Sequence, residues 1–433
     1  MEPRSETLAE RGDSPVRLPS AWSSGHEQRS GWTRLKQAAP SLVSVGVLAS
    51  IVPAVLGLGA WSATSVPREL GEYVVFAQND LGMHCMQRDY SRFLILPPYN
   101  SVNAWVYRRG ESPQPVTELQ GGRSLTIHVP GNTRSSDKTN WWRHAESLLG
   151  QAFEPEIGLT GNGMSGEFEL AARGLFEYVG MPITPLDDAD RVNPYQLATV
   201  EFRQGDDILA STQAVLPVSW ELRCDLCHGD PAPGLNAELD ILRDHDRLHG
   251  TTLEASQPVF CAGCHADPAL GAAGQPGVSA FSHAMHGAHA DRLVDLPMTL
   301  ANECYACHPG ERAQCQRDVH QMNQVNCNDC HGGMADVGDE ARTPWIDEPR
   351  CADCHERQGF EFEPAGVLFR NARGHGGVAC VVCHGSPHAI TPTVTEADNL
   401  QHLSIQGHAG TLDTCTVCHI QQPTDPFPHR RDD

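Results

Sequence analysis

Residues 351–388 read CADCHERQGFEFEPAGVLFRNARGHGGVACVVCHGSPH, and they contain the pattern Cys-x-x-Cys-His twice. The chain of 433 residues contains this pattern seven times, always after residue 220. The first cysteines of the copies are Cys224, Cys261, Cys304, Cys327, Cys351, Cys380 and Cys415. The second cysteines are Cys227, Cys264, Cys307, Cys330, Cys354, Cys383 and Cys418. The histidines that follow them are His228, His265, His308, His331, His355, His384 and His419.

The order of residues in the pattern indicates one kind of chemistry. A single copy is compatible with a redox dithiol or half of a zinc site, but seven copies that each end in histidine are specific for c-type haem attachment. Two thioether bonds join the cysteine sulfurs to the porphyrin, and the next residue then lies beneath the iron, where imidazole is a good axial ligand. Zinc sites and disulfides do not require this order. The sequence therefore predicts seven haem c groups, attached through these cysteines and coordinated on the proximal side by these histidines.

Successive copies of the motif lie close together. Their first cysteines are 37, 43, 23, 24, 29 and 35 residues apart. Such spacings leave no room for a separate domain around each haem. The region is also rich in Gly, Pro and Asp and has little hydrophobic periodicity. We therefore expect residues 221–433 to form a mostly irregular, short-helical heptahaem cytochrome c domain, organised around its haems and folded only when they are bound.

The sixth ligand of each iron decides between electron transfer and catalysis. Residues 224–433 contain eleven histidines outside the motifs and four methionines, so we expect mostly bis-histidine haems of low potential. A histidine that binds no iron is the alternative at each position. The expected distal ligands are His245, His249, His286, His289, His375, His388 and His408. The reserves are His283, His320 and His402, and His429 completes the set.

Residues 71–220 have a different composition. Their short runs of alternating or β-branched residues, separated by Gly, Pro and Asn, are typical of strands. The expected strands lie at 71–77, 103–107, 124–129, 167–170 and 197–202, and one short helix is expected at 140–149. This pattern predicts a β-rich, sandwich-like domain before the haem region. Cys85 in this domain and Cys315 in the haem region lie outside the motifs, and they either form a disulfide or remain free thiols.

The N-terminus has the features of an export signal. Residues 41–61 carry no charge and are long enough to cross a bilayer, and Arg29, Arg34 and Lys36 precede them. We expect either a cleaved signal peptide or a transmembrane anchor, and a disordered leader over 1–40. Either version places the remainder of the chain in the periplasm or outside the cell, and an uncleaved segment would anchor it to the inner membrane.

The net charge limits the class of partner. With 54 acidic and 31 basic residues the formal charge is −23, which argues against a general nucleic-acid binder. Haem propionates would add to the negative charge. Partners with a basic surface are therefore expected, although acidity that only maintains solubility is an equal alternative.

Several stretches resemble a group of secreted bacterial multihaem c-type cytochromes that have an N-terminal β-rich domain. The stretches are NDLGMHC at 79–85, LPPYN at 96–100, GLTG at 158–161, CHPG at 307–310, CHGSPHAI at 383–390 and QGHAG at 406–410. They are spread over most of residues 72–420, and NDLGMHC is the most particular of them. The resemblance implies periplasmic or extracellular electron transfer with redox proteins or an extracellular acceptor as partners. It implies no defined substrate.

Three functions are compatible with these features. The first is an electron conduit in respiratory or extracellular electron transfer, in which saturated irons bind no substrate. The second is a reductase of a small oxyanion, which needs one haem with an open iron. The third is a homo-oligomer or haem filament assembled through histidines donated between subunits. The first is expected because every motif ends in histidine and spare histidines are plentiful.

Overall fold

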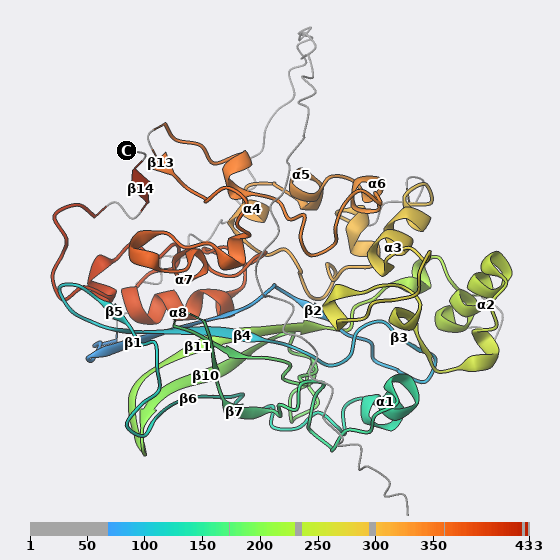
Figure 1. Ribbon diagram of the computed structural model, residues 1–433, viewed down its shortest axis with the longest axis horizontal. Helices are drawn as coiled ribbons and strands as arrows, with labels where there is room; N and C mark the ends of the chain where they lie inside the picture. Colours follow the sequence, from blue (N-terminus) through green and yellow to red (C-terminus); the bar gives the residue numbers. More distant parts are fainter. Residues whose placement is uncertain are drawn as a thin grey trace, which may run out of the picture.

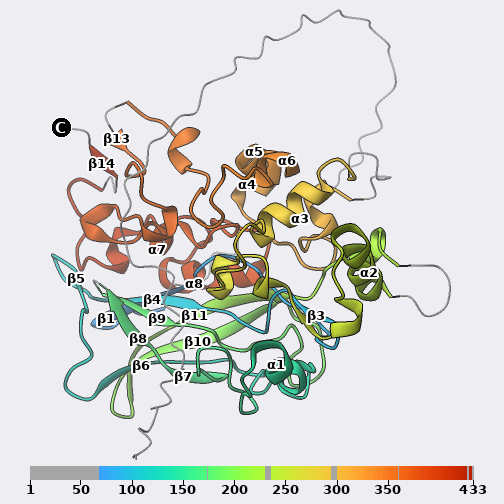
Figure 2. The ribbon, with the colours of Figure 1, turned by 45° about the vertical axis from the view of Figure 1, so that its right-hand side comes forward.

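The computed structural model describes residues 68–172, 174–229, 236–293, 300–358, 360–426 and 429–431. The expected leader at 1–40 and the apolar segment at 41–61 lie outside the described residues. Among the described helices, none has the length and apolar character needed to span a membrane. Figures 1 and 2 show a β-rich half and, along one side of it, a half made of short helices and irregular segments.

The β-rich half contains two sheets that pack against each other. In the first sheet the order is β1 (Tyr73–Asn79), β4 (Val102–Arg108), β9 (Leu175–Tyr178) and β8 (Glu169–Ala172), with β5 (Gln114–Pro115) also paired to β4. In the second sheet the order is β2 (His84–Cys85), β11 (Asp207–Ser219), β10 (Tyr195–Gln204), β6 (Arg123–His128) and β7 (Ser165–Glu167). The rings of Tyr73 in β1 and Phe202 in β10 meet between the sheets with centroids 5.1 Å apart.

The alternation of residues along the strands accounts for this core. In β10, Ala198, Val200 and Phe202 are fully buried, whereas the residues between them are half-buried. Side chains two apart lie on the same face of a strand, so these three point into the space between the sheets. β10 pairs antiparallel with β11 on one side and β6 on the other. Four of the five expected strands are present, with ends that differ by a few residues. The expected strand at 167–170 is divided at Phe168, because β7 ends at Glu167 in the second sheet and β8 begins at Glu169 in the first.

The expected helix at 140–149 is confirmed as α1 (Trp141–Leu149), and Gly150 ends it in the left-handed conformation. Trp141, Ala145 and Leu148 are buried on one face, as the spacing predicts. Trp141 is fully buried in the sheet core and contacts Tyr90 edge-on at 5.1 Å. Its role is packing.

The second half contains short helices joined by irregular chain. The α-helices are α2 (Ala237–His249), α3 (Phe281–His289), α4 (Val319–Met322), α5 (Cys327–His331), α6 (Met334–Val337), α7 (Cys380–His384) and α8 (Glu396–Gln406). The 3-10 turns outside the motifs are η2 (Glu254–Ser256), η4 (Pro268–Leu270), η7 (Phe369–Asn371) and η8 (His375–Gly377). Two small sheets join β12 (Val259–Phe260) to β3 (Phe93–Leu94) and β13 (Phe360–Glu361) to β14 (Arg430–Arg431). The expected irregular, short-helical character is therefore confirmed for the described residues.

The two halves share a second hydrophobic core. The outer face of the first sheet contributes Val74, Phe76, Trp105 and Tyr107. These side chains pack against a set from the helical half that consists of Ala379, Val381, Val382, Ile405 and Val417. Figure 1 shows α7 and α8 lying over the strands β1 and β4. The first sheet is consequently covered on both faces.

Hydrogen bonds between the two halves, two of them buried, reinforce this contact. The Ala77 amide donates to the Gln401 side-chain oxygen at 2.8 Å, and the Thr212 hydroxyl donates to the same oxygen at 2.9 Å. The Arg109 guanidinium donates to the carbonyl oxygens of Thr416 and Val417, each at 2.9 Å. The compositional boundary near residue 220 coincides with the end of β11, and independent folding of the two parts stays a prediction.

A fragment of residues 70–220 tests this prediction. It retains the core between its sheets, so its circular dichroism should show β structure without haem. It also exposes Val74, Phe76, Trp105 and Tyr107, so it should self-associate in analytical ultracentrifugation. The same fragment with Val74→Thr and Phe76→Thr places β-branched polar residues on that face and should self-associate less, because only Trp105 and Tyr107 remain of the four exposed apolar side chains. A random-coil spectrum of the unsubstituted fragment would show that the β-rich part needs the haem region to fold.

Candidate haem sites

Each Cys-x-x-Cys-His motif forms a single helical turn. The histidine amide donates to the carbonyl of the first cysteine at 2.9 Å in the first motif, 3.0 Å in the second and 2.8 Å in the third. Two motifs form the whole of α5 and α7. The others contain the 3-10 turns η1 (Cys224–Leu226), η3 (Cys261–Gly263), η5 (Glu303–Ala306), η6 (Cys351–Asp353) and η9 (Cys415–Val417). This turn brings two sulfurs and one imidazole together, as thioether attachment with a proximal ligand requires.

A second histidine ring lies opposite every motif histidine. Each of these partners comes from outside the motifs. The ring centroids are 6.2 Å apart for His228–His289, 6.3 Å for His265–His245, 6.2 Å for His308–His286, 6.0 Å for His331–His388, 6.0 Å for His355–His320, 6.0 Å for His384–His429 and 6.0 Å for His419–His375.

This separation fits a metal ion between two imidazoles. An iron–nitrogen bond of about 2 Å on each side, with the distance from each nitrogen to its ring centre added, separates the centroids by about 6 Å. Direct ring contact would allow shorter distances, as between His245 and His249, whose centroids are 4.8 Å apart. The seven pairs therefore have the spacing of axial ligands of haem iron.

The hydrogen bonds of the paired rings leave one nitrogen available. The Nδ1 atoms of His286 and His289 contact the carbonyl oxygens of Ser282 and Met285 at 2.7 and 2.6 Å. Other paired rings also use Nδ1, with partners at 2.8–3.0 Å: His245, His265, His320 and His419. A bond at Nδ1 fixes the ring and directs Nε2 toward a metal.

Four of the described histidines after residue 224 belong to no ring pair with a motif, and three of them, His283, His402 and His408, use the other nitrogen. The Nε2 atom contacts the Arg342 carbonyl in His283 at 2.7 Å, the Val382 carbonyl in His402 at 3.3 Å and the Asp413 carboxylate in His408 at 3.1 Å. His402 is buried, and its Nδ1 contacts the Gly410 carbonyl at 2.6 Å. These contacts occupy the nitrogen that an iron would need.

Five of the seven expected distal ligands lie opposite a motif histidine: His245, His286, His289, His375 and His388. The other two, His249 and His408, have no ring contact with a motif histidine among the described residues, and the assignment of distal ligands stays a prediction. His249 follows His245 by one helical turn and contacts that ring, and His408 is turned toward Asp413. His320, a reserve, and His429 take their places opposite His355 and His384. His429 lies 45 residues after its partner in the chain, so no local pattern identifies it.

Burial keeps several motif imidazoles neutral. Desolvation, followed by interactions with neighbouring histidines, lowers the pKa of His308, His331 and His384 to about 4. Neutral imidazole is the form that binds a metal, so these rings are ready to bind iron at neutral pH. They would become charged only in acid, where coordination would compete with protons.

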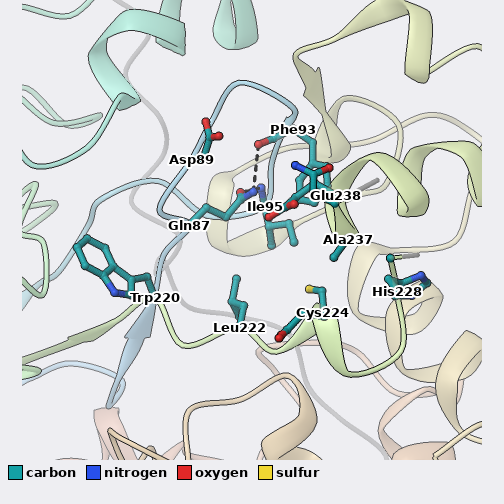
Figure 3. Close-up of a pocket in the computed structure, with 13 residues that line it drawn as sticks. Gln87, Asp89, Phe93, Ile95, Trp220, Leu222, Cys224, His228, Ala237 and Glu238 are labelled. Atoms are coloured by element: carbon teal, nitrogen blue, oxygen red, sulfur yellow. Dashed lines mark hydrogen bonds between the residues drawn. The ribbon is translucent and has the colours of Figure 1, made fainter. Parts of the chain in front are cut away.

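Open space adjoins two of the motifs. A cavity of about 600 Å³ lies beside Cys224 and His228, and Trp220 and Leu222 also line it. Figure 3 shows that Gln87, Phe93 and Ile95 of the β-rich half close its other side. A second cavity of about 410 Å³ lies beside His355, and Phe360 and Phe362 line it. The walls of both cavities mix polar side chains with aromatic or aliphatic ones, and each cavity gives room beside a motif for a bound group.

The NDLGMHC stretch lies against one of these sites. The Asn79 side-chain oxygen accepts hydrogen bonds from the amides of Leu81 and Gly82, which closes a tight turn. Gly82 has φ +105°, and a Cβ atom there would lie 3.0 Å from His388 Nδ1 and 3.1 Å from the Pro387 carbonyl oxygen. Glycine thus permits both the backbone conformation and the close approach to His388.

The two cysteines outside the motifs are free thiols in this structure. Cys85 lies in β2, and its pKa is raised by burial and further by Cys315, so the two thiols are neighbours. Burial raises the pKa of Cys315 to about 11. The two half-buried thiols thus lie near each other, and the choice between a disulfide and free thiols stays a prediction.

The comparisons with known proteins agree with this chemistry over a part of the chain. No curated protein and no solved structure matches the chain. Residues 336–385 match the family described as cytochrome c554 and c-prime. This stretch contains the whole of the fifth and sixth motifs. The match supports a c-type cytochrome with covalently bound haem c as its cofactor and with haem-based electron transfer as its chemistry.

Proposed function

We propose that the chain is an exported heptahaem c-type cytochrome that transfers electrons through seven bis-histidine haems. The observation that carries this proposal is the set of seven ring pairs separated by 6.0–6.3 Å, each with one motif histidine. The motif cysteines would hold the porphyrins, and the paired histidines would fill both axial positions. Haem supplies the one-electron couple, and the protein supplies position and electrostatic environment.

The ring pairs favour this function over the alternatives. A reductase of an oxyanion needs an iron with an open position, and here each motif histidine faces a second histidine of the same chain. A filament joined by ligands from other subunits would leave at least one motif without a partner. The seven pairs within one chain would supply both axial ligands of every iron, so neither an open iron nor a ligand from another subunit is needed.

Shared elements suggest the order of the first haems, which we number by motif. Helix α2 carries His245, opposite His265, and Asp240, whose Oδ2 lies 3.6 Å from His228 Nδ1, so haems 2 and 1 would be neighbours. Helix α3 carries His289 for haem 1 and His286 for haem 3.

The remaining haems would follow the sequence. Asn302 donates to Asn328 at 2.7 Å and joins motifs 3 and 4. Cys354 lies near enough to Cys330 to raise its pKa, and His355 lies near enough to His384 to lower its pKa, so motifs 4, 5 and 6 would be neighbours. The Leu412 amide donates to the Cys383 carbonyl at 2.9 Å and joins motifs 6 and 7. The proposed path is therefore 2–1–3–4–5–6–7.

We propose a periplasmic or extracellular location, with residues 41–61 as a signal peptide or inner-membrane anchor. Haem attachment to this motif takes place outside the cytoplasm, and this segment is the one export feature of the sequence. Redox proteins with basic surfaces, or an extracellular acceptor, would be the partners of a chain with formal charge −23.

The haem count is the first test. The purified protein should contain seven haems by pyridine haemochrome assay, and its intact mass should exceed that of the processed polypeptide by seven haem masses. Seven complete motifs are the reason. A stoichiometry of four or fewer would rule out the heptahaem proposal.

Ligand substitution is the second test. His320→Ala and His429→Ala should each convert about one haem in seven from low-spin to high-spin iron in EPR spectra, because each removes one axial ligand. His249→Ala and His408→Ala are matched controls and should leave seven low-spin irons. If a control contains high-spin iron and neither His320→Ala nor His429→Ala does, the distal ligands are His249 and His408, as the sequence predicts, and the structural assignment is wrong.

A further inference from the structure

We infer that Asp318 lowers the reduction potential of haem 5 by accepting a hydrogen bond from its distal ligand His320. This inference rests on the proposed function, because it takes His320 and His355 as ligands of one iron. Asp318 would touch neither the iron nor the porphyrin, and it is a positioning residue that acts through the imidazole.

The contact is short and sheltered from water. Asp318 Oδ2 lies 2.8 Å from His320 Nδ1, and the side chain of Asp318 is 6% exposed. The carboxylate of Asp318 is also held in place by hydrogen bonds at the start of helix α4. As the N-cap of α4, Asp318 accepts hydrogen bonds at Oδ1 from the backbone amides of His320 and Gln321, each at 3.1 Å. The capping bonds use Oδ1, so Oδ2 remains directed at the ring.

The geometry also fixes which imidazole nitrogen faces the metal. Since Nδ1 carries the proton donated to Asp318, Nε2 is left for the iron, and His320 lies 6.0 Å from His355 between ring centroids. A charged acceptor at Nδ1 gives the imidazole more anionic character than a neutral acceptor does. That change makes Nε2 a stronger donor and stabilises Fe(III) relative to Fe(II).

Other paired histidines provide the comparison. Nδ1 of His286 and His289 contacts backbone carbonyl oxygens, and Nδ1 of His245 contacts the Thr251 hydroxyl at 2.9 Å. These acceptors are neutral. His228 faces a carboxylate as well, but its Nδ1 is 3.6 Å from Asp240, beyond ordinary hydrogen-bond distance.

The nearest cation does not cancel the charge of Asp318. Arg317 is fully buried beside it, but its guanidinium donates to both carboxylate oxygens of Asp398, at 2.6 and 2.9 Å. This bidentate pair neutralises Arg317 internally. The negative charge of Asp318 is therefore free to act on His320. A redox partner would supply the one electron that reduces Fe(III) to Fe(II) in haem 5, and the proton would stay on His320 Nδ1.

The test is a redox titration of the whole haem-loaded protein, followed by optical and EPR spectra. Asp318→Asn should move the couple of haem 5 to a more positive potential, and by more than any of the other six couples, while seven low-spin irons remain. Asparagine retains an oxygen that can cap α4, so the helix should survive. Asp318→Ser also keeps a capping oxygen and should shift the same couple in the same direction.

Asp413→Asn is the matched control. Asp413 also contacts a histidine, His408, at 3.1 Å, but that ring uses Nε2 for the contact and its partner carboxylate is 70% exposed. No couple should move in this variant. Unchanged couples in both Asp318 variants, with seven low-spin irons, would overturn the inference and leave the proposed function standing. Loss of low-spin iron in both would also overturn it, because Asp318 would then hold the ring rather than tune it. Fewer than seven low-spin irons in the unsubstituted protein would overturn the proposed function itself.

Discussion

The spacing of two imidazoles around an iron is the constraint on which the proposed arrangement depends. It requires two rings whose centres lie about 6 Å apart, with Nε2 of each facing the metal. The described chain contains seven pairs that meet the distance condition, at 6.0–6.3 Å. Most pairs join distant segments, such as His320 with His355 and His375 with His419. If each pair holds an iron, the axes cross-link a region whose own helices are too short to be stable alone.

The sequence predicts local features well and long-range pairing poorly. The motif turns, the strands of the β-rich half and the helix ending at Gly150 follow from residues close together in the chain. The distal ligands do not, because a histidine gives no local sign of which nitrogen it will use. His408 lies in a stretch typical of the family resemblance, yet its Nε2 contacts Asp413, whereas His429 lies in no such stretch and faces His384. The deciding information is the hydrogen bond at the other ring nitrogen, which requires the tertiary structure.

The same limit applies to the boundary between the two halves. Composition places it near residue 220, and β11 does end at Ser219. Composition alone does not show that the outer face of the first sheet is covered. Phe76 is fully buried by contacts with the helical half, and the turn at Gly82 reaches His388. The β-rich half therefore helps to position one of the proposed iron ligands, in addition to forming its own core.

The proposed order of the haems in space departs from their order in the chain, and one helix accounts for this. Helix α3 follows the second motif, and His286 and His289 are three residues apart on it, so the two rings lie on neighbouring parts of one face. One ring faces the first motif and the other faces the third. The histidine of motif 2, His265, lies opposite His245 of α2. A pair of histidines separated by three residues can thus bring two haems together without a domain around either, which explains how spacings of 23–43 residues suffice for a continuous path.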